Sequence, residues 1–361
     1  MAHPDVCIAG AGIIGLSLAL ELHDRGARVT VLDRDEPLAE ASTAAAGMLA
    51  ANDPENPPQL LPLSELSLAL YPKFLDRLFE LSGLLTRFHT STTLQALPSG
   101  HEQFARQLPI LSSEALSLLA PGISPGDKRF LLLNEHSLDP RELAKVLLAA
   151  VRATSIDLRT HTPIRVVRSI PGSAEILTAT NAVHSYQFAD CTGAWSAPAA
   201  LPKHLHISPR KGQMLAVALP DSLPLHVVLR TPDIYIVPRT TGMMGTRAII
   251  GATVEDVGFD KTVNPADIAR LHSRAAELLP AIADAPEVET WAGLRPSTPD
   301  DLPLIGAIPG YENQFLATGH YRNGILLAPA TARVMAELIS DQRLSVDIAA
   351  FSPLRPPLAR H

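Results

Sequence analysis

The sequence predicts an α/β fold in which a discontinuous Rossmann-type dinucleotide-binding domain is joined to an antiparallel-sheet α+β domain for the substrate. Residues 5–33 run strand, glycine turn, helix, strand and acid, which is typical of a dinucleotide-binding unit. Residues 207–253 contain strand-like runs separated by proline, glycine and threonine, which is typical of an antiparallel sheet. The length of 361 residues suits two domains.

The glycine turn in residues 5–33 carries the first motif, Gly10-Ala-Gly12-Ile-Ile-Gly15. Gly10 allows the tight turn, Gly12 lets the backbone approach a pyrophosphate, and Gly15 lets helix and strand pack closely. The pyrophosphate would lie at the positive end of the helix dipole. Asp33 follows at the spacing of a residue that accepts from a ribose hydroxyl, which favours FAD or NAD over NADP. A coincidental glycine-rich turn would not require this acid.

Composition excludes several classes of function. A content of 46% apolar and 19% charged residues is ordinary for a soluble globular protein, and the net charge of −7 predicts no binding to nucleic acid or to an anionic membrane. Cys7 and Cys191 lie in strand-like runs, so we expect buried thiols in a reducing, cytoplasmic compartment. The apolar residues 6–22 contain the glycine motif and lack a basic start, which argues against a signal or membrane segment. His204-x-His206 has no carboxylate or cysteine nearby, so we expect no metal site.

Residues 42–49 are small, with Ser42 as a plausible N-cap; they either lie flat against a ligand or form a tightly packed helix start. Residues 63–81 have helical periodicity, and Tyr71-Pro72 predicts a break. Residues 86–135 give no clear order of strands.

Residues 139–151 form an amphipathic pattern, with Asp139 as N-cap and a proline in the first turn. Strand-like runs follow at 156–159, 164–169, 174–179 and 184–191, and the last leads to Thr192-Gly193-Ala194-Trp195, a second place where backbone could approach a cofactor. Helices are expected at 265–279 and at 323–340. No internal repeat is evident.

Two arginines stand among apolar or small neighbours, Arg295 in Trp-Ala-Gly-Leu-Arg-Pro and Arg322 in Gly-His-Tyr-Arg-Asn-Gly. A buried guanidinium needs an anionic or carbonyl partner. Either each binds a substrate carboxylate, which suits its fork of donors, or each forms an internal salt bridge. The internal partners could be Asp300, Asp301 or Asp190. Tyr235 could donate to the same carboxylate or be an ordinary core tyrosine.

Other catalytic patterns are missing from the sequence. We find no Ser-His-Asp pattern, no P-loop lysine and no zinc constellation. A second GxGxxG is also missing, so a separate NAD(P)H domain is not expected. If one dinucleotide binds, the other redox partner is expected to be a small molecule.

Five motifs covering nearly the whole chain resemble the D-amino acid oxidase (DAO) family of flavoproteins, and within it the bacterial glycine oxidases. They are Gly10-x-Gly-Ile-Ile-Gly15, Ala44-Ala-Ala-Gly-Met-Leu49, Tyr235-Ile-Val-Pro-Arg239, Trp291-Ala-Gly-Leu-Arg-Pro296 and Gly319-His-Tyr-Arg-Asn-Gly-Ile-Leu-Leu-Ala-Pro-Ala330. The last two are long and specific.

The resemblance implies FAD as the cofactor, and it places cofactor contacts in several segments. The turn and the second strand supply Gly10, Gly12, Ile13, Ile14, Gly15, Asp33 and Arg34. The flavin and its ribityl chain would lie along Ser42, Thr43, Ala46, Gly47 and Met48, with Val167 at the adenine. The remaining contacts are Thr192, Gly193, Trp195, His320, Tyr321, Arg322, Asn323, Gly324, Ile325 and Leu326.

The resemblance also implies oxidative deamination of glycine and other small amines or D-amino acids. A hydride passes from the substrate Cα to flavin N5 once the amine is neutral, O2 takes the electrons to give H2O2, and the imine hydrolyses to a 2-oxo acid and ammonia. Arg295 and Arg322 would hold the substrate carboxylate, and Tyr235 would line the pocket. The implied role is in thiazole and thiamine biosynthesis, and the implied assembly is a homo-oligomer, a dimer or tetramer.

Two competing functions are a D-amino acid or secondary-amine dehydrogenase of the same fold with a non-O2 acceptor, and a flavin-binding protein that has lost catalysis. The two arginines and Tyr235 argue against the second. Some relatives attach flavin through a cysteine near the segment of Arg295; none occurs here, so we expect non-covalent FAD. Asp233 would disfavour acidic substrates if it faces the cavity, and Val254 is expected to form one wall. We expect 1–75, 136–202 and 291–361 in the FAD-binding domain, with 76–135 and 203–290 in the substrate domain.

Overall fold

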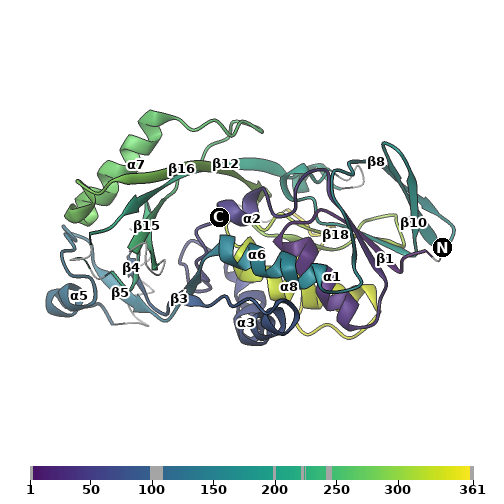
Figure 1. Cartoon of the computed structure of the whole chain (residues 1–361), viewed down its shortest axis with the longest axis horizontal. Helices are drawn as coiled ribbons and strands as arrows, with labels where there is room; N and C mark the ends of the chain where they lie inside the picture. The colour runs from purple at the N-terminus through teal and green to yellow at the C-terminus, as the bar shows by residue number, and fades with distance from the viewer. Residues whose placement is uncertain are drawn as a thin grey trace.

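The computed structural model describes residues 3–97, 109–197, 201–220, 223, 225–240 and 246–357. Within them, the six-stranded sheet has the order β17-β18-β11-β1-β2-β7 and the seven-stranded sheet has the order β16-β12-β15-β14-β13-β4-β5. A three-stranded sheet, β10-β9-β8, and the pair β3-β6 complete the strands (Figure 1). The expected α/β architecture with a separate antiparallel sheet is confirmed.

The six-stranded sheet begins with the predicted dinucleotide-binding unit. β1 (Val6–Ala9) pairs in parallel with β2 (Val29–Leu32) and β11 (Gln187–Asp190), and α1 (Ile13–Asp24) connects the first two. Strands β1 and β2 are buried along their whole length, as expected for parallel strands covered on both faces. The other strands of this sheet are β7 (Asp157–Arg159), β17 (Leu304–Ala307) and β18 (Gln314–Thr318).

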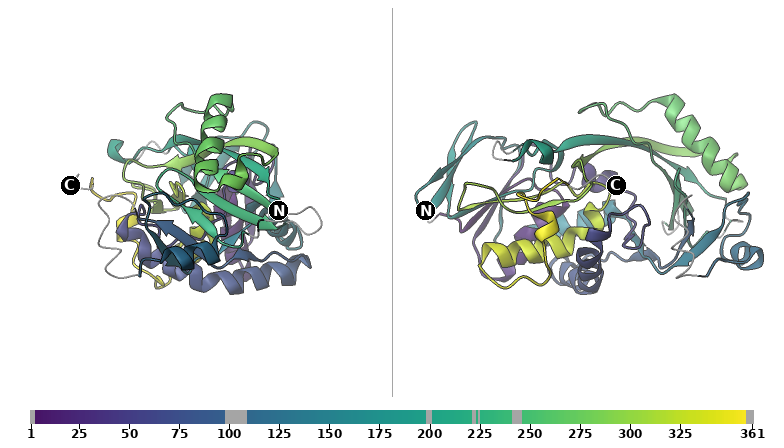
Figure 2. Two further views of the ribbon diagram at one scale, coloured as in Figure 1. Left: turned by 90° about the vertical axis from the view of Figure 1, so that its left-hand side faces the viewer. Right: turned by 180° about the vertical axis from the view of Figure 1, so that it is seen from behind.

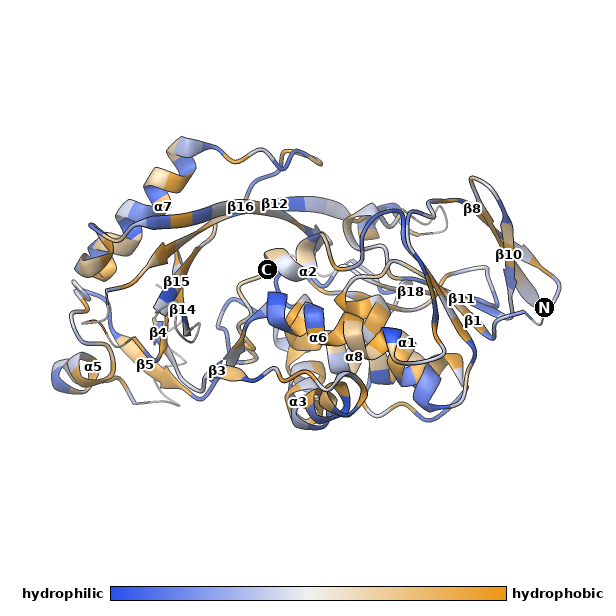
Figure 3. Ribbon diagram, viewed as in Figure 1, coloured by the Kyte–Doolittle hydropathy of each residue, from blue (hydrophilic) through white to orange (hydrophobic). Residues whose placement is uncertain are grey.

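Helices α1, α3 (Leu61–Ser82), α6 (Pro140–Arg152) and α8 (Gly324–Ile339) pack together in the core beside this sheet. The hydropathy colouring shows α6 with one polar and one apolar face (Figure 3). Its N-cap is Asp139, as predicted, because the carboxylate accepts from the Arg141 N–H at 2.8 Å. None of the helices in the described part of the chain is long and apolar enough to cross a membrane.

The break predicted at Tyr71-Pro72 is wrong: α3 continues through Pro72. The cost of a missing backbone hydrogen bond is offset by packing, because the Tyr71 side chain is fully buried and its hydroxyl donates to the Ile325 carbonyl at 2.5 Å.

The contact between α3 and α8 compensates for a second proline. Pro329 has no N–H for the Ile325 carbonyl one turn earlier, and the Tyr71 hydroxyl takes its place. Ser67 inserts beside it, donating to the Leu326 carbonyl at 2.6 Å and accepting from the Ala330 N–H at 3.2 Å. Seen from behind, α8 in yellow lies beside α3 in dark blue (Figure 2). These bonds fix the first turns of α8.

The seven-stranded sheet is antiparallel except where β13 pairs with β4. The two longest strands of this sheet, β12 and β16, lie side by side and extend toward the six-stranded sheet (Figure 1). Helix α7 (Pro265–Leu278) packs on it around a second apolar core. The strands are β4 (Thr93–Ala96), β5 (Phe130–Leu133), β12 (Ser208–Ala218), β13 (Val228–Arg230), β14 (Tyr235–Thr240), β15 (Thr246–Gly251) and β16 (Glu287–Ser297).

The segment 86–135, which the sequence leaves unordered, supplies β4 and β5 to the seven-stranded sheet. The proposed domain limits stay a prediction, and the limit at residue 291 falls inside β16. The remaining helices and strands are α2 (Ala41–Ala44), β3 (Phe88–Thr90), α5 (Ser113–Leu119), β6 (Ser137–Leu138), β8 (Ile164–Ile170), β9 (Ser173–Thr178) and β10 (Ala182–Ser185). Short 3-10 turns lie at Pro58–Leu60, Gly193–Trp195, Lys203–Leu205, Pro280–Ile282 and Ala349–Phe351.

Candidate active site

The turn between β1 and α1 requires glycine at two of its three motif positions. Gly10 has φ +97°, and a Cβ there would lie 2.5 Å from the Cys191 carbonyl oxygen. A Cβ at Gly15 would lie 1.9 Å from the Gly10 oxygen, so the helix packs against the turn through bare backbone. Gly12 differs, because the nearest atom to a Cβ there is the Ser42 hydroxyl at 3.5 Å. The surface above Gly12 is therefore open to a ligand.

A cavity of about 300 Å³, within the size of small-molecule sites, runs from this turn to the seven-stranded sheet. It brings together residues that are far apart in the sequence. The predicted site residues that line it are Gly10, Gly12, Ile13, Ile14, Arg34, Ser42, Ala46, Gly47, Met48, Thr192, Gly193, Trp195, Tyr235, Arg295, His320, Tyr321, Arg322, Asn323, Gly324 and Ile325.

Five predicted cofactor residues lie outside this lining: Gly15, Asp33, Thr43, Val167 and Leu326. Gly15 packs against the turn. Thr43 donates its hydroxyl to the Leu38 carbonyl at 2.9 Å, Val167 lies on β8 in the three-stranded sheet, and Leu326 is in the core. Their roles toward a cofactor stay predictions.

Asp33 lies at the end of β2, where its carboxylate orders the turn. One oxygen accepts from the Ala11 N–H at 2.6 Å and the other from the Asp35 N–H at 2.9 Å. A carboxylate oxygen can accept more than one hydrogen bond, so these contacts leave acceptor capacity for a ribose hydroxyl.

The N-cap expected at Ser42 is wrong. The one-turn helix α2 is preceded by Glu40 at that position, and Ser42 lies inside α2. Its hydroxyl instead accepts from the Ile13 N–H at 3.0 Å. The first turn of α1 has N–H groups with no partner inside the helix, and Ser42 satisfies one of them at the edge of the cavity.

One register row of the seven-stranded sheet faces the cavity. Directly opposed residues of neighbouring strands project to the same face, and pairing links this row from β4 to β16. We call it the cavity-facing row; its members are Gln95, Arg230, Tyr235, Gly251 and Met214, which all line the cavity, and the pairing continues to Trp291 on β16, which lies outside the lining.

Two glycines make room on this face for the predicted substrate-binding side chains. A Cβ at Gly251 would lie 2.3 Å from the Tyr235 hydroxyl, and one at Gly212 would lie 2.1 Å from Nη2 of Arg295. Both side chains therefore extend over bare backbone. Burial raises the pKa of Tyr235, although the neighbouring Arg295 guanidinium opposes this shift. Tyr235 is thus a neutral hydrogen-bond donor beside a cation.

The guanidinium of Arg295 contacts carbonyl groups. Nη1 donates to the Thr253 carbonyl at 3.1 Å and to the Lys211 carbonyl at 3.3 Å. No carboxylate among the described residues pairs with Arg295. The candidate internal partners are engaged elsewhere: Asp300 pairs with Arg355, Asp301 lies beside Ser297, and Asp190 accepts from Thr192 and Ser196. Arg295 therefore keeps donors for an anion.

A polar network behind the sheet fixes the carbonyls that hold Arg295. Lys211 and Glu255 exchange two backbone hydrogen bonds of 2.9 and 3.0 Å, and their side chains pair at 3.3 Å. Gln213 donates to Glu255 and to Asp267, each at 2.7 Å. Because Lys211 and Gln213 are buried, this network clasps the segment after β15 to β12.

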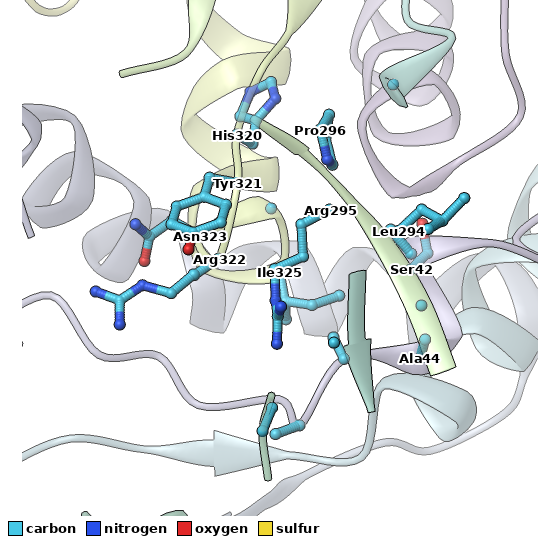
Figure 4. A pocket seen from close by; sticks show the side chains of 18 of the residues that line it. Ser42, Ala44, Leu294, Arg295, Pro296, His320, Tyr321, Arg322, Asn323 and Ile325 are labelled. Atoms are coloured by element: carbon cyan, nitrogen blue, oxygen red, sulfur yellow. The ribbon is translucent and has the colours of Figure 1, made fainter. Parts of the chain in front are cut away.

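Arg322 follows a different pattern. Nη1 pairs with Glu55 at 2.5 Å and Nη2 lies 3.8 Å from Asp53. Arg322 and Arg295 enter the same cavity from the loop before α8 and from β16 (Figure 4). The internal ion pair that the sequence left open is therefore present for Arg322.

His320 lies in the loop between β18 and α8. Its Nε2 lies 3.1 Å from the Thr331 hydroxyl, and burial lowers the pKa of His320 to about 3. The imidazole is thus neutral near pH 7. In the described part of the chain, no group of three or more His, Cys, Asp or Glu side chains could hold a metal ion.

Sequence reasoning missed several lining residues. Gly212 and Gly251 give no local signal, because their role depends on side chains from other strands. Arg230 ends an apolar run, which is the same signal that singled out Arg295. Asp53 and Glu55 lie in a proline-rich loop with no further pattern.

Comparison with known proteins agrees with this geometry. Residues 5–338 match the family model described as DAO, FAD dependent oxidoreductase. The chain is 34% identical to a glycine oxidase of Pseudomonas aeruginosa over 96% of this chain and 98% of that protein. It is 38% identical to a bifunctional protein ThiO/ThiG of Trichormus variabilis over 94% of this chain, and it spans about half (53%) of that relative's length.

A solved structure is also similar. The glycine oxidase of Geobacillus kaustophilus superposes with a TM-score of 0.91 at 29% identity, covering 99% of this chain and all (100%) of that one. The open surface above Gly12, at a helix N-terminus, fits a dinucleotide pyrophosphate. The chain therefore belongs to the DAO family of FAD dependent oxidoreductases, and FAD is its cofactor.

Proposed function

We propose that this enzyme oxidatively deaminates glycine and other small amines or D-amino acids. The observation that carries the proposal is Arg295, a cavity-lining guanidinium held by two carbonyls and paired with no carboxylate of the described chain. A fork of donors that is already oriented suits the carboxylate of an amino acid. Glycine oxidases among the relatives support the substrate class.

The chain's residues act mainly by positioning. Arg295 and Tyr235 would bind the carboxylate from the sheet side, which orients the Cα toward the cofactor. Arg322, neutralised by Glu55, would close the cavity from the α8 side. When bound, FAD supplies the acceptor for a hydride from that Cα. Overall, an amino acid, O2 and water would give a 2-oxo acid, ammonia and H2O2.

We assign the FAD contacts to the lining residues near the turn, in residues 46–48 and in residues 320–325. Attachment would be non-covalent, because neither cysteine lies on β16. Both Cys7 and Cys191 are buried, and burial raises the pKa of each thiol. An inert thiol is a poor nucleophile toward a flavin.

Two exposed lining residues would shape substrate choice. Asp233 is exposed and lies 3.8 Å from Arg274, and Val254 is 56% exposed at the same cavity. A carboxylate at the cavity edge disfavours acidic substrates by repulsion, as the sequence led us to expect.

We further propose O2 as the electron acceptor and thiamine biosynthesis, in its thiazole branch, as the pathway. The half-length match to proteins named ThiO/ThiG supports the pathway. Complementation tests the pathway. The gene for this protein should restore growth, on medium without thiazole, to a bacterial strain that lacks glycine oxidase. We also propose a cytoplasmic location, which cell fractionation tests. We propose that the protein is a homo-oligomer, a dimer or tetramer, which light scattering tests.

The central experiment is an anaerobic titration of the FAD-loaded protein with glycine, sarcosine and D-alanine, followed by admission of air. Bleaching of the flavin absorbance and rapid recovery with H2O2 would support the oxidase. Bleaching without recovery would identify the dehydrogenase that uses another acceptor. No bleaching with any of the three would refute the amino-acid function.

A further inference from the structure

A second buried arginine, Arg230, lines the cavity beside Tyr235. Arg230 is directly opposite Tyr235 across the β13–β14 pair and opposite Gln95 across the β4–β13 pair. All three belong to the cavity-facing row and project to one face. The mechanism proposed above uses Tyr235 and leaves Arg230 without a role.

The donors of Arg230 are only partly used. Nε donates to the Gln95 side-chain oxygen, and Nη2 lies 3.0 Å from a Glu135 oxygen. Within the part of the chain that the structure describes, Nη1 has no hydrogen-bond partner, and Nη2 has only this ion pair and no hydrogen bond of good geometry. Arg230 is only 4% exposed, and a buried donor without an acceptor carries an uncompensated desolvation penalty. A ligand acceptor in the cavity would remove that penalty.

Nearby charges decide which acceptor fits. Glu135 is 2% exposed and accepts from the Asn52 N–H at 3.1 Å. Asp53 lies 3.9 Å from Arg230 and 3.8 Å from Arg322, and Glu55 pairs with Arg322. Two arginines therefore face three carboxylates, so positive charge is already balanced. A second carboxylate on the substrate would meet repulsion, whereas a neutral acceptor would meet a free N–H donor.

We propose that Arg230 forms a specificity subsite for a neutral hydrogen-bond acceptor, a carboxamide or hydroxyl, on the side chain of the amino-acid substrate. The subsite rests on the proposed function, because Arg295 must hold the carboxylate at the other end. It favours carboxamide side chains over apolar and acidic side chains of the same shape. Glycine does not reach it.

Three carboxylic acids of nearly equal shape test the subsite without turnover. Succinamate, 4-methylpentanoate and succinate carry a carboxamide, an isopropyl group and a second carboxylate opposite the shared carboxylate. Dissociation constants come from the change in flavin absorbance of the FAD-loaded protein. We expect succinamate to bind about tenfold more tightly than either of the other two, the effect of one hydrogen bond to a charged donor.

Two variants separate specificity from folding. Arg230→Lys keeps a cation beside Glu135 but removes the Nη1 donor, and Arg230→Met with Glu135→Gln removes the ion pair without leaving a lone buried charge. In both, the preference for succinamate should fall to within about twofold. Arg152→Lys, at an exposed arginine at the end of α6, is the matched control and should keep the wild-type preference.

The same order should appear in the rate of flavin reduction, measured relative to that with glycine. D-asparagine should reduce the flavin faster than D-leucine or D-aspartate. Equal binding of the three acids by the wild type, or a preference unchanged in both variants, would overturn the subsite and leave Arg295 in its role. Failure of the wild type to bind any of the three acids, while glycine still reduces the flavin, would overturn the subsite alone. Failure of glycine, sarcosine and D-alanine to reduce the flavin would overturn the proposed function, and the subsite with it.

Discussion

In the turn between β1 and α1, Gly10 and Gly15 bring two stretches of backbone together, whereas Gly212 and Gly251 in the seven-stranded sheet make room for side chains. A Cβ at Gly15 would collide with a backbone oxygen. A Cβ at Gly212 would collide with the guanidinium of Arg295. The first region thus offers backbone N–H groups to a cofactor, and the second offers two side chains to a substrate.

The two regions differ in how local they are. The turn and its acid lie within residues 5–33, so helix, strand and ligand contacts follow from one contiguous pattern. The sheet site joins β4, β13, β14, β15, β12 and β16 through register. Its geometry therefore depends on pairings between distant segments, and changes in the two regions should affect different ligands.

The substitution Gly212→Ala should give the largest effect that separates the two regions. The added methyl would displace the Arg295 guanidinium, so kcat/KM for glycine should fall about 100-fold or more while FAD stays bound. Gly12→Ala is the contrasting change, because a Cβ there would meet only the Ser42 hydroxyl, at 3.5 Å, and would fill space that the pyrophosphate would need. It should weaken FAD binding, measured by flavin fluorescence. Loss of FAD from both variants alike would show that the two regions are not separable.

A smaller effect is expected behind the sheet, at Glu255→Gln. The variant weakens the pairing with buried Lys211, which loosens the two carbonyls that orient Arg295. The KM for glycine should rise about 3- to 10-fold, with kcat reduced less. Glu287→Gln, at an exposed glutamate of β16, is the matched control. Unchanged KM in Glu255→Gln would mean that Arg295 needs no such support.

The acid stability of this clasp should depend on Glu255. Burial alone would raise the pKa of Glu255, but hydrogen bonds from Thr253, Gln213 and Lys211 hold that pKa below its usual value. A lowered pKa stabilises the fold above the usual value of about 4.3 and loses that contribution as pH falls further. Urea unfolding should therefore separate wild type from Glu255→Gln at pH 7, with the difference shrinking below about pH 4. A difference that grows in acid would contradict the sign of this shift.

The smallest expected effect concerns the support of α8. Tyr71→Phe leaves the Ile325 carbonyl without a donor, because Pro329 cannot supply one. The free energy of unfolding should fall by about 1–3 kcal/mol. Tyr186→Phe, at an exposed tyrosine, should change it little. Equal free energies of unfolding for the two variants would show that the Tyr71 hydroxyl does not stabilise α8.

The sequence was sufficient for features that are local or periodic. The dinucleotide-binding unit, the Asp139 cap and the strands between 207 and 253 all follow from short-range pattern and were found as predicted. The Pro72 break and the Ser42 cap failed because distant partners, the α8 carbonyl and the α1 amide, decide those positions. Arg295 and Arg322 looked alike in sequence, yet among the described residues only Arg322 has carboxylate partners, since Asp53 and Glu55 come from a loop far away in the chain.

The most direct test of the proposed function compares anaerobic flavin reduction by glycine in the wild type and in Arg295→Met, with Arg152→Lys, at an exposed arginine of α6, as control. In the proposed function, Arg295 binds the carboxylate and so orients the Cα. Flavin reduction by glycine should therefore slow about 100-fold or more in Arg295→Met, with FAD still bound. The control should reduce at the wild-type rate. Reduction of Arg295→Met at the wild-type rate would contradict the account, because the carboxylate would then be held elsewhere.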